Sequence, residues 1–415
     1  MALSRNANLS LAISTPRSNL NPDKPSNSIV LFALWMLVFA SSSQIMILSP
    51  ILPQIGTQLS IPTSALGSLV SAYTLMVGSL AIISGPISDK IGRRRILLLG
   101  TSLMTFALMM HHFIVGYYSF LTVRILAGIA GGILSGSAVA YIGDFFPYNR
   151  RGWATGWVMS GMAFGQIAGI PLGILLSSQY GFKFPFYMFA LAMGMTTVLI
   201  WFRIPQPDVE LTQEPLTIRK SVDNYLAMLR QKEIAAAAVA YFMMFLGLSF
   251  FILYLPFWLT DSLNATPETI ATMFIVGGIA NVLTGPQAGK LSDRIGRKTI
   301  VIISNLGLAV VMVLTTFFTR ELWLAYPLYF IIMVLVAMRI SPFSALLTAL
   351  VSDSRRGALM SLAVALGQFG FAIGGTLAGL LYTGFGFQSS TLAGALAMLV
   401  TAIVVAKFVP EPDVS

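Results

Sequence analysis

The sequence predicts an all-α integral membrane protein with twelve transmembrane helices in two six-helix halves. Of the 415 residues, 56% are hydrophobic and only 10% are charged, and the mean hydropathy is +0.82. A soluble globular protein needs a much larger share of polar surface. Apolar runs long enough to cross about 30 Å of hydrocarbon recur along the whole chain. A charged turn that follows the second run returns after the eighth, which indicates two similar halves.

The apolar runs are separated by short polar segments. In chain order, the expected spans are residues 28–52, 64–88, 96–117, 120–143, 153–177, 184–202, 235–259, 268–290, 299–318, 323–347, 357–382 and 391–408. An even number of spans places both termini on the same side of the membrane. The first six spans form an N-terminal half at 28–202, and the last six form a C-terminal half at 235–408.

The distribution of the basic residues predicts the orientation. In this topology 21 of the 25 Lys and Arg residues fall on one side, whereas Lys183 and Arg320 fall on the other and Arg124 and Arg339 lie within spans. Cytoplasmic loops carry such an excess of Lys and Arg. The net charge of +10 therefore reports topology and contact with anionic lipids, and nucleic acid is not expected as a partner. We expect cytoplasmic termini and a monomeric, multi-pass protein of the cell (inner) membrane.

Three polar segments lie outside the spans. Residues 1–27 and 409–415 are expected to be cytoplasmic tails, the first of them disordered. Residues 203–234 form a predicted cytoplasmic linker. Apolar side chains recur in the linker at helical spacing, which predicts a short amphipathic helix on the inner surface, with a plain linker as the alternative; they are Ile218, Val222, Tyr225, Leu226 and Leu229. The chain has no cysteine, so disulfides and thiolate metal sites are excluded, and we expect neither a metal nor a cofactor.

The repeated charged turn predicts a gate at the inner ends of the second and eighth spans. It reads Gly85-Pro-Ile-Ser-Asp89-Lys-Ile-Gly-Arg93-Arg94 and then Gly289-Lys-Leu-Ser-Asp293-Arg-Ile-Gly-Arg297-Lys298, with the aspartates 204 residues apart. A glycine at the membrane edge lets two helices approach, and an aspartate there can face a helix N-terminus or pair with the neighbouring bases. Anchoring by positive charge alone is the alternative. A second pair of loops agrees with the repeat: Asp144 with Arg151, and Asp353 with Arg356.

The first turn, Gly85 to Arg94, resembles the signature loop of the major facilitator superfamily. The second turn, Gly289 to Lys298, resembles a good second copy of the same loop. The resemblance covers essentially the whole chain. It implies a secondary transporter that works by alternating access, in which these loops act as a conformational gate. The chain shows no zinc-protease motif, no Ser–His arrangement and no phosphate-binding loop, so we do not expect an enzyme or an ATP-driven pump.

Two further motifs lie within spans four and five. Arg124 is about 20 residues from Asp144, which places this costly intramembrane charge in the outer half of span four. It resembles the span-four arginine linked to proton transfer in proton-coupled drug exporters, and an arginine snorkelling to the outer headgroups is the alternative.

Small residues in span five predict close helix packing and resemble an exporter motif, although the proline comes one residue later than in the family. The packing residues are Gly165, Gly169, Pro171 and Gly173, with Gly370 and Gly374 at matching positions in span eleven.

Few polar side chains lie at mid-membrane depth, so each is a candidate for binding substrate. We expect this role for Arg339, which precedes a Ser341-Pro342 kink, and for Gln44, Gln166 and Gln368. Each glutamine could instead join two helices. The two histidines, His111 and His112 in span three, are possible proton carriers, but the resemblance makes span three peripheral.

All fifteen acidic residues fall in tails, loops or helix ends. Two intramembrane arginines without a deep acid favour an anionic or zwitterionic substrate over a lipophilic cation. The sequence therefore predicts a proton-coupled exporter of a small organic molecule, with anionic or amphiphilic molecules favoured and drug-like molecules included. An uptake symporter or a facilitator is the first alternative, and a sensor that keeps the fold without transporting is the second.

Overall fold

The computed structural model describes residues 27–209, 211, 218–352 and 355–411. Twelve helical stretches in these ranges are long and apolar enough to cross a membrane. The predicted all-α membrane fold is therefore confirmed. Asp353 and most of the two expected tails lie outside the described residues.

The N-terminal half contains the first six spans. Its helices are α1 (Asn27–Met46), α2 (Leu48–Leu59), α3 (Thr63–Ile91), α4 (Arg93–Met109), η1 (Met110–Phe113), α5 (Tyr117–Leu134), α6 (Ser137–Phe145), α7 (Tyr148–Phe164), η2 (Gly165–Gly169), α8 (Ile170–Tyr180) and α9 (Phe184–Arg203). Span four is built from α5 and α6, and span five is built from α7, η2 and α8.

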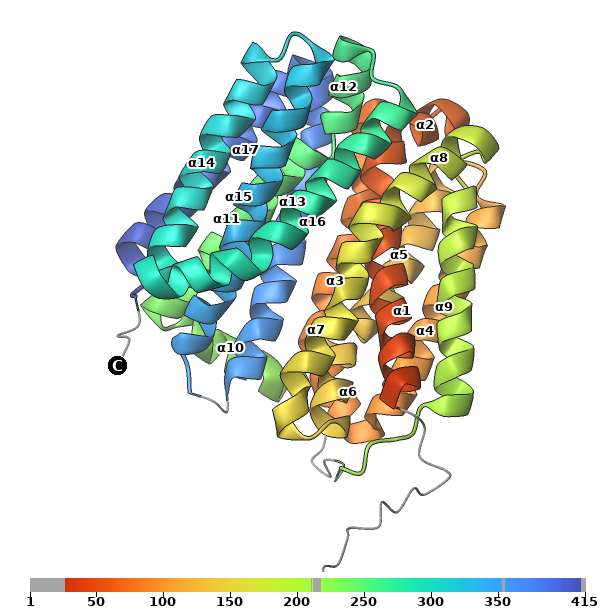
Figure 1. The fold of residues 1–415 in the computed structure, drawn as a ribbon, viewed down its shortest axis with the longest axis vertical. Helices are drawn as coiled ribbons and strands as arrows, with labels where there is room; N and C mark the ends of the chain where they lie inside the picture. The colour runs from red at the N-terminus through yellow and green to blue at the C-terminus, as the bar shows by residue number, and fades with distance from the viewer. Residues whose placement is uncertain (1–26, 210, 212–217, 353–354, 412–415) are drawn as a thin grey trace, which may run out of the picture.

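The linker helix and the C-terminal half follow. They are α10 (Ile218–Leu229), α11 (Lys232–Ile252), α12 (Leu255–Leu263), α13 (Pro267–Ile295), α14 (Arg297–Phe318), α15 (Leu322–Ala349), α16 (Arg356–Phe385) and α17 (Phe387–Phe408). Figure 1 shows the two halves as bundles that lie side by side. The short helices α2 and α12 are adjacent at one end of the molecule, and α10 lies at the other end.

The charged turns continue the helices further than the sequence predicted. Spans two and eight were expected to end at residues 88 and 290, but α3 runs to Ile91 and α13 runs to Ile295. Charges at the headgroup layer do not interrupt backbone hydrogen bonding, so hydropathy places the end of such a helix too early. Gly92 and Gly296 end the two helices, each with φ of +99°. A glycine suits this backbone conformation, which side chains rarely adopt.

The two halves are packed tightly against each other toward the outer side. The main contacts are between α3 and α16 and between α13 and the η2–α8 segment. A Cβ on Gly67 would collide with the carbonyl oxygen of Gly375, and a Cβ on Gly379 would collide with the carbonyl oxygen of Ser64. Small residues on both helices therefore let the backbones meet. The Tyr254 hydroxyl adds a hydrogen bond to the carbonyl of Thr63, at 2.8 Å.

The inner ends of the same helices are less crowded. A Cβ on Gly85 of α3 or on Gly285 of α13 would meet no atom within 4 Å. On Gly289 it would meet only the Ser341 hydroxyl oxygen, at 3.6 Å. The close helix approach expected at the gate glycines is thus absent in this conformation, in which the outer side holds the tight contacts between the halves.

Spans one and seven are interrupted at matching positions. Ile47 separates α1 from α2, and Leu253 and Tyr254 separate α11 from α12. Each break precedes a proline, Pro50 or Pro256, which lacks the N–H of a helical hydrogen bond. The outer tips of these two spans therefore form separate short helices, and α2 and α12 contact each other across the two halves.

Candidate functional site

In the first charged turn, Arg93 holds two carboxylates at the inner end of the N-terminal half. Its Nη2 lies 2.5 Å from Oδ1 of Asp89, and its Nε lies 2.6 Å from Oδ2 of Asp144. Its Nη1 donates a hydrogen bond to the Ser88 hydroxyl at 2.9 Å. This one guanidinium therefore connects the end of α3 with the end of α6, and it joins the two loops that the sequence predicted as gates in this half.

The second charged turn has a looser ion pair. Nη2 of Arg297 lies 3.3 Å from Oδ1 of Asp293; the Asp293 side chain is largely exposed and the Arg297 side chain is partly buried. The N-terminus of α14 is capped by Glu411, whose two carboxylate oxygens accept the backbone N–H groups of Arg297 and Lys298 at 2.7 Å each. A carboxylate there also compensates the positive end of the helix dipole.

The remaining predicted gate residues contact their own half. Arg94 of α4 donates to the carbonyl of Trp201, at 2.7 Å. Arg151 donates to the carbonyl of Phe146 at 3.1 Å, and Arg356 donates to that of Thr348 at 3.2 Å. Their role in gating stays a prediction, because in this conformation these contacts do not cross between the halves.

Arg124 lies at the centre of a buried polar cluster on α5. Its side chain is fully buried; Nη1 donates to the Gln44 side-chain oxygen at 3.2 Å, and Nε donates to the Leu69 carbonyl at 3.4 Å. The guanidinium also lies over the ring of Tyr73, 4.4 Å from its centroid. Nη2 has no hydrogen-bond partner among the described residues. Arg124 is thus held by α1 and α3, and one of its donors is unused.

The predicted substrate ligand Gln44 is part of this cluster. Its side chain is fully buried, its oxygen accepts from Arg124, and its amide nitrogen donates to the Tyr73 hydroxyl at 2.9 Å. Close packing of α5 on α3 makes the cluster possible, because a Cβ on Gly128 would lie 2.5 Å from the Tyr73 carbonyl oxygen. Gln44 therefore orients Arg124 in this conformation, and its contact with substrate stays a prediction.

Arg339 lies inside the C-terminal half. Only 1% of its surface is exposed; Nη1 lies 2.9 Å from the Asn305 side-chain oxygen and from the Met398 sulfur, and Nη2 donates to the Met244 carbonyl at 3.4 Å. These partners lie on α14, α17 and α11, and α17 packs against both of the other helices within this half. The arginine expected to bind substrate thus joins helices here, and a substrate role stays a prediction.

Gln166 and Gln368 lie where the two halves meet. Gln166 of η2 accepts a hydrogen bond from the Asn281 amide of α13, at 3.1 Å. Its own amide faces the Met46 sulfur at 3.7 Å. Gln368 of α16 packs with its Cβ facing Gly78 of α3. Gln166 therefore links spans one, five and eight near the middle of the membrane.

The glycines of spans five and eleven lie against the first helix of their own half. A Cβ on Gly165 would collide with the Ser43 hydroxyl oxygen, and a Cβ on Gly169 would lie 2.9 Å from the same atom. Gly374 likewise faces Ser249 of α11. Gly173 faces Ile47, and Gly370 faces the Phe242 carbonyl.

The segment before Pro171 is a π-helical turn, in which the Ile170 N–H bonds to the Gly165 carbonyl. Such turns often occur at functional sites.

The two histidines have different surroundings. His111 is fully buried and stacked on Phe186, with ring centroids 3.8 Å apart, and its Nδ1 lies 3.1 Å from the carbonyls of Ala107 and Leu108. His112 is exposed, and its Nδ1 lies 2.9 Å from the Tyr187 hydroxyl. Within the described ranges, no group of three or more His, Asp and Glu side chains is arranged to hold a metal ion.

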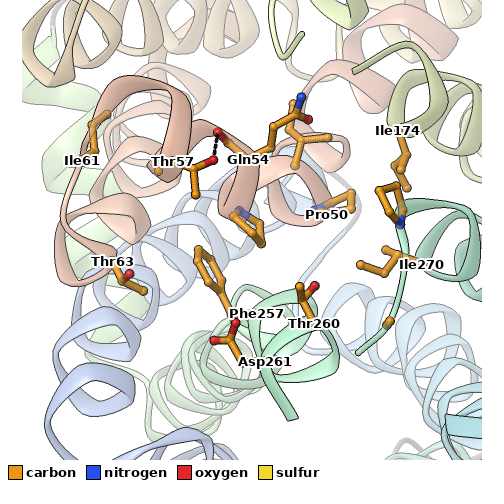
Figure 2. A pocket seen from close by; sticks show the side chains of 15 residues that line it. Pro50, Gln54, Thr57, Ile61, Thr63, Ile174, Phe257, Thr260, Asp261 and Ile270 are labelled. Carbon is orange, nitrogen blue, oxygen red and sulfur yellow. Dashed lines mark hydrogen bonds between the residues drawn. The ribbon is translucent and has the colours of Figure 1, made fainter. Parts of the chain in front are cut away.

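A cavity of about 550 Å³ lies between the outer tips of the two halves. Gln54 and Thr57 of α2 face Phe257, Thr260 and Asp261 of α12 across it (Figure 2). The Asp261 carboxylate accepts a hydrogen bond from the Tyr382 hydroxyl at 2.9 Å. This cavity has the size of a small-molecule site, but none of the predicted site residues Arg124, Gln44, Gln166 and Gln368 lines it.

The model of the Major Facilitator Superfamily matches residues 34–258 and 237–415, which together span nearly the whole chain. The chain belongs to the major facilitator superfamily. Superfamily members are transporters and not enzymes, so the absence of catalysis expected from the sequence agrees with the family.

Curated relatives from this superfamily are distant in sequence. The chain is 21% identical to the uncharacterized transporter YbcL of Bacillus subtilis (strain 168), over 91% of this chain and 95% of the relative. It is 23% identical to the multidrug resistance protein MdtG of Serratia proteamaculans (strain 568), over 90% of this chain and 92% of the relative.

Solved structures share the fold. A D-xylose–proton symporter superposes with a TM-score of 0.75 at 20% identity, over 92% of this chain and 98% of the symporter. The human organic anion transporter MFSD10 superposes with a TM-score of 0.69 at 18% identity, over 91% of this chain and 98% of the transporter. At these identities the comparison establishes the architecture of a superfamily transporter and leaves the substrate open.

Sequence reasoning missed the two residues that cap the helices after the charged turns of this superfamily member. Gln206 accepts the backbone N–H of Arg94 at 3.0 Å, as Glu411 does for Arg297 in the second half. A signal for both was available, because Pro205-Gln206-Pro207-Asp208 returns as Pro410-Glu411-Pro412-Asp413 after 205 residues. The repeat thus extends beyond the membrane spans to the segment that follows each half.

Proposed function

We propose that this major facilitator protein is a proton-coupled exporter of a small organic molecule in the cell membrane, working as a monomer by alternating access. Anionic or amphiphilic molecules are the favoured substrate class. The charged turns form the inner gate, Arg124 serves coupling, and Gln166, Gln368 and Arg339 are the candidate contacts for substrate.

The observation that carries the proposal is the environment of Arg124. The guanidinium is fully buried and faces Gln44 and Tyr73, with no carboxylate among its hydrogen-bond partners in the described residues. Among the described residues, no Asp or Glu lies in the central part of a membrane span. A buried charge without a counter-ion is costly. Arrival of an anionic group near Arg124, or a rearrangement that hydrates it, would lower that cost.

Two observations support export. The relatives include several proteins named multidrug resistance protein MdtG, and span five carries a glycine–proline pattern that resembles the exporter motif. In the structure this pattern produces the π-helical turn at Gly165–Gly169, and Gln166 of that turn bonds to Asn281 in the other half. A span-five element that joins the halves at mid-membrane depth is suited to transmit a change at the binding site.

The second candidate is a facilitator or an uptake symporter. The facilitator is favoured by the same lack of a deep carboxylate, since a carboxylate is the usual carrier of a coupling proton at membrane depth. Arg124 would then help to bind substrate without any proton transfer.

Transport in proteoliposomes tests both candidates. Purified protein is reconstituted, a pH gradient of either sign is imposed, and the movement of matched fluorescent organic anions and cations is followed. We expect anion movement against its own gradient only when the pH gradient is present, and loss of this movement in Arg124→Gln. Movement that ignores the pH gradient would select the facilitator, and a clear preference for cations would refute the proposed substrate class.

A further inference from the structure

The linker helix α10 contacts both halves of the protein at the inner side. Its residues Tyr225 and Met228 are buried, with 9% and 1% of their surface exposed. They belong to an apolar cluster with residues of α11, α15 and α16, among them Ile234, Phe343 and Leu359. This packing attaches α10 to the C-terminal half.

Tyr225 also reaches the N-terminal half. Its hydroxyl donates a hydrogen bond to the backbone carbonyl of Ile82 in α3, at 3.1 Å. Ile82 lies four residues before Pro86, so this carbonyl has no helical N–H partner. Burial raises the pKa of the Tyr225 hydroxyl, which keeps it protonated and able to donate. Pro86 itself belongs to the first charged turn, so α10 is bonded directly to the helix that carries the gate.

The same arrangement recurs at the outer side. The Ser49 hydroxyl donates to the carbonyl of Ile252 at 2.8 Å, across the two halves. Ile252 lies four residues before Pro256, so its carbonyl also lacks a helical partner. In a membrane protein an unpaired carbonyl needs a donor from a neighbouring element. Proline thus creates an acceptor for a donor from the other half at each end of the molecule.

We propose that α10 is a strap across the inner side, and that the bond from the Tyr225 hydroxyl to the Ile82 carbonyl sets how readily the two halves rock. The strap stabilises the conformation seen here, in which the outer ends are packed together. Inner closure moves α3 relative to the C-terminal half and breaks this bond, so Tyr225 is a positioning residue for the conformational change and has no contact with substrate.

The proposal is tested by a distance measurement that requires no substrate. Because the chain has no cysteine, Thr57→Cys in α2 and Thr260→Cys in α12 can carry spin labels without removal of native thiols. Both residues are exposed and face each other across the outer cavity (Figure 2). Pulsed electron paramagnetic resonance then reports the short and long distances of the closed and open outer side.

Tyr225→Phe removes the hydroxyl and keeps the ring. We expect the ratio of long to short distances to rise roughly fivefold, the effect of one neutral hydrogen bond. Tyr326→Phe is the matched control, because the Tyr326 hydroxyl bonds to Thr272 and Thr269 within the C-terminal half. Equal distributions in Tyr225→Phe, Tyr326→Phe and the parent would overturn the proposal.

Pro86→Ala provides an independent check, because it returns an N–H that can pair with the Ile82 carbonyl. In this background Tyr225→Phe should change the distances much less than it does alone, which a double-mutant cycle measures. A full, additive effect of Tyr225→Phe would show that the hydroxyl acts elsewhere and would refute the strap. The inference assumes alternating access, but its outcome is independent of substrate, direction and coupling, so it can fail while the proposed export stands.

Discussion

The two halves each bury one arginine, but they use it differently. Arg124 is held by Gln44 and Tyr73 on α1 and α3, and α3 makes the most extensive contact with the C-terminal half. Arg339 is held by Asn305, Met398 and the Met244 carbonyl inside its own half. The two positions do not correspond in the internal repeat. A repeated architecture with arginines at unrelated positions indicates that the halves share a fold and differ in their buried polar chemistry.

The largest effect is expected from Arg124→Gln. Removal of this charge should reduce transport driven by a pH gradient by at least roughly tenfold, the scale of a typical coupling free energy. Purified Arg124→Gln should remain monodisperse, since Gln can still bond to Gln44. Transport assays in proteoliposomes measure the loss. If Arg124→Gln still showed unchanged, gradient-dependent transport, Arg124 would have no role in coupling, and both arginines would be structural residues.

Arg339→Gln should act first on stability. Its loss leaves the Asn305 side-chain oxygen without its donor and removes the contact to the Met244 carbonyl, and interhelical hydrogen bonds in membranes contribute about 1–2 kcal/mol at most. We expect a lower Tm and a smaller change in transport than in Arg124→Gln. A thermal-shift screen with candidate ligands provides the contrast. A ligand that stabilises the parent protein but not Arg339→Gln would place Arg339 in the substrate site, as the sequence predicts.

Asp89→Asn compares the two charged turns. The Asp89 carboxylate is about half exposed, with 46% of its side-chain surface accessible, and an exposed ion pair contributes about 0–1 kcal/mol. We therefore expect near-normal insertion and Tm but transport reduced several-fold, because the loss affects switching. Asp293→Asn is the matched variant in the other half. Normal transport in Asp89→Asn would contradict the predicted latch.

The smallest effect is expected from the caps. Glu411→Gln should lower stability by about 0.3–1 kcal/mol, the contribution of a carboxylate at a helix N-terminus, and high salt should diminish the difference. Gln206→Glu should raise stability by a similar amount. Thermal unfolding at low and high salt measures both. If the caps acted only through hydrogen bonds of equal strength, neither variant would change the stability, and the predicted loss for Glu411→Gln and gain for Gln206→Glu would not be seen.

The sequence was sufficient for the fold, because hydropathy, charge asymmetry and a repeat of 204–205 residues are all properties of chain order. It also predicted that Gly165, Gly169 and Gly374 occur in packing helices, although not the serines that they face. The direction in which the buried polar side chains point could not be predicted from the sequence. A span such as 322–349 is apolar on all sides, so nothing in its pattern shows whether Arg339 faces the centre of the protein or its own half. The partners of Ile82 were hidden for another reason, since a proline reveals a free carbonyl but not the donor that reaches it.

The breaks before Pro50 and Pro256 have a mechanical consequence. They divide spans one and seven into a long shaft and a short outer tip, and the two tips touch each other across the molecule. A tip on its own hinge can swing while the shaft stays still. We expect the contact between the two outer tips to open locally before the two bundles rotate. We therefore expect solvent entry at the outer face and the large rearrangement of the halves to be separable steps.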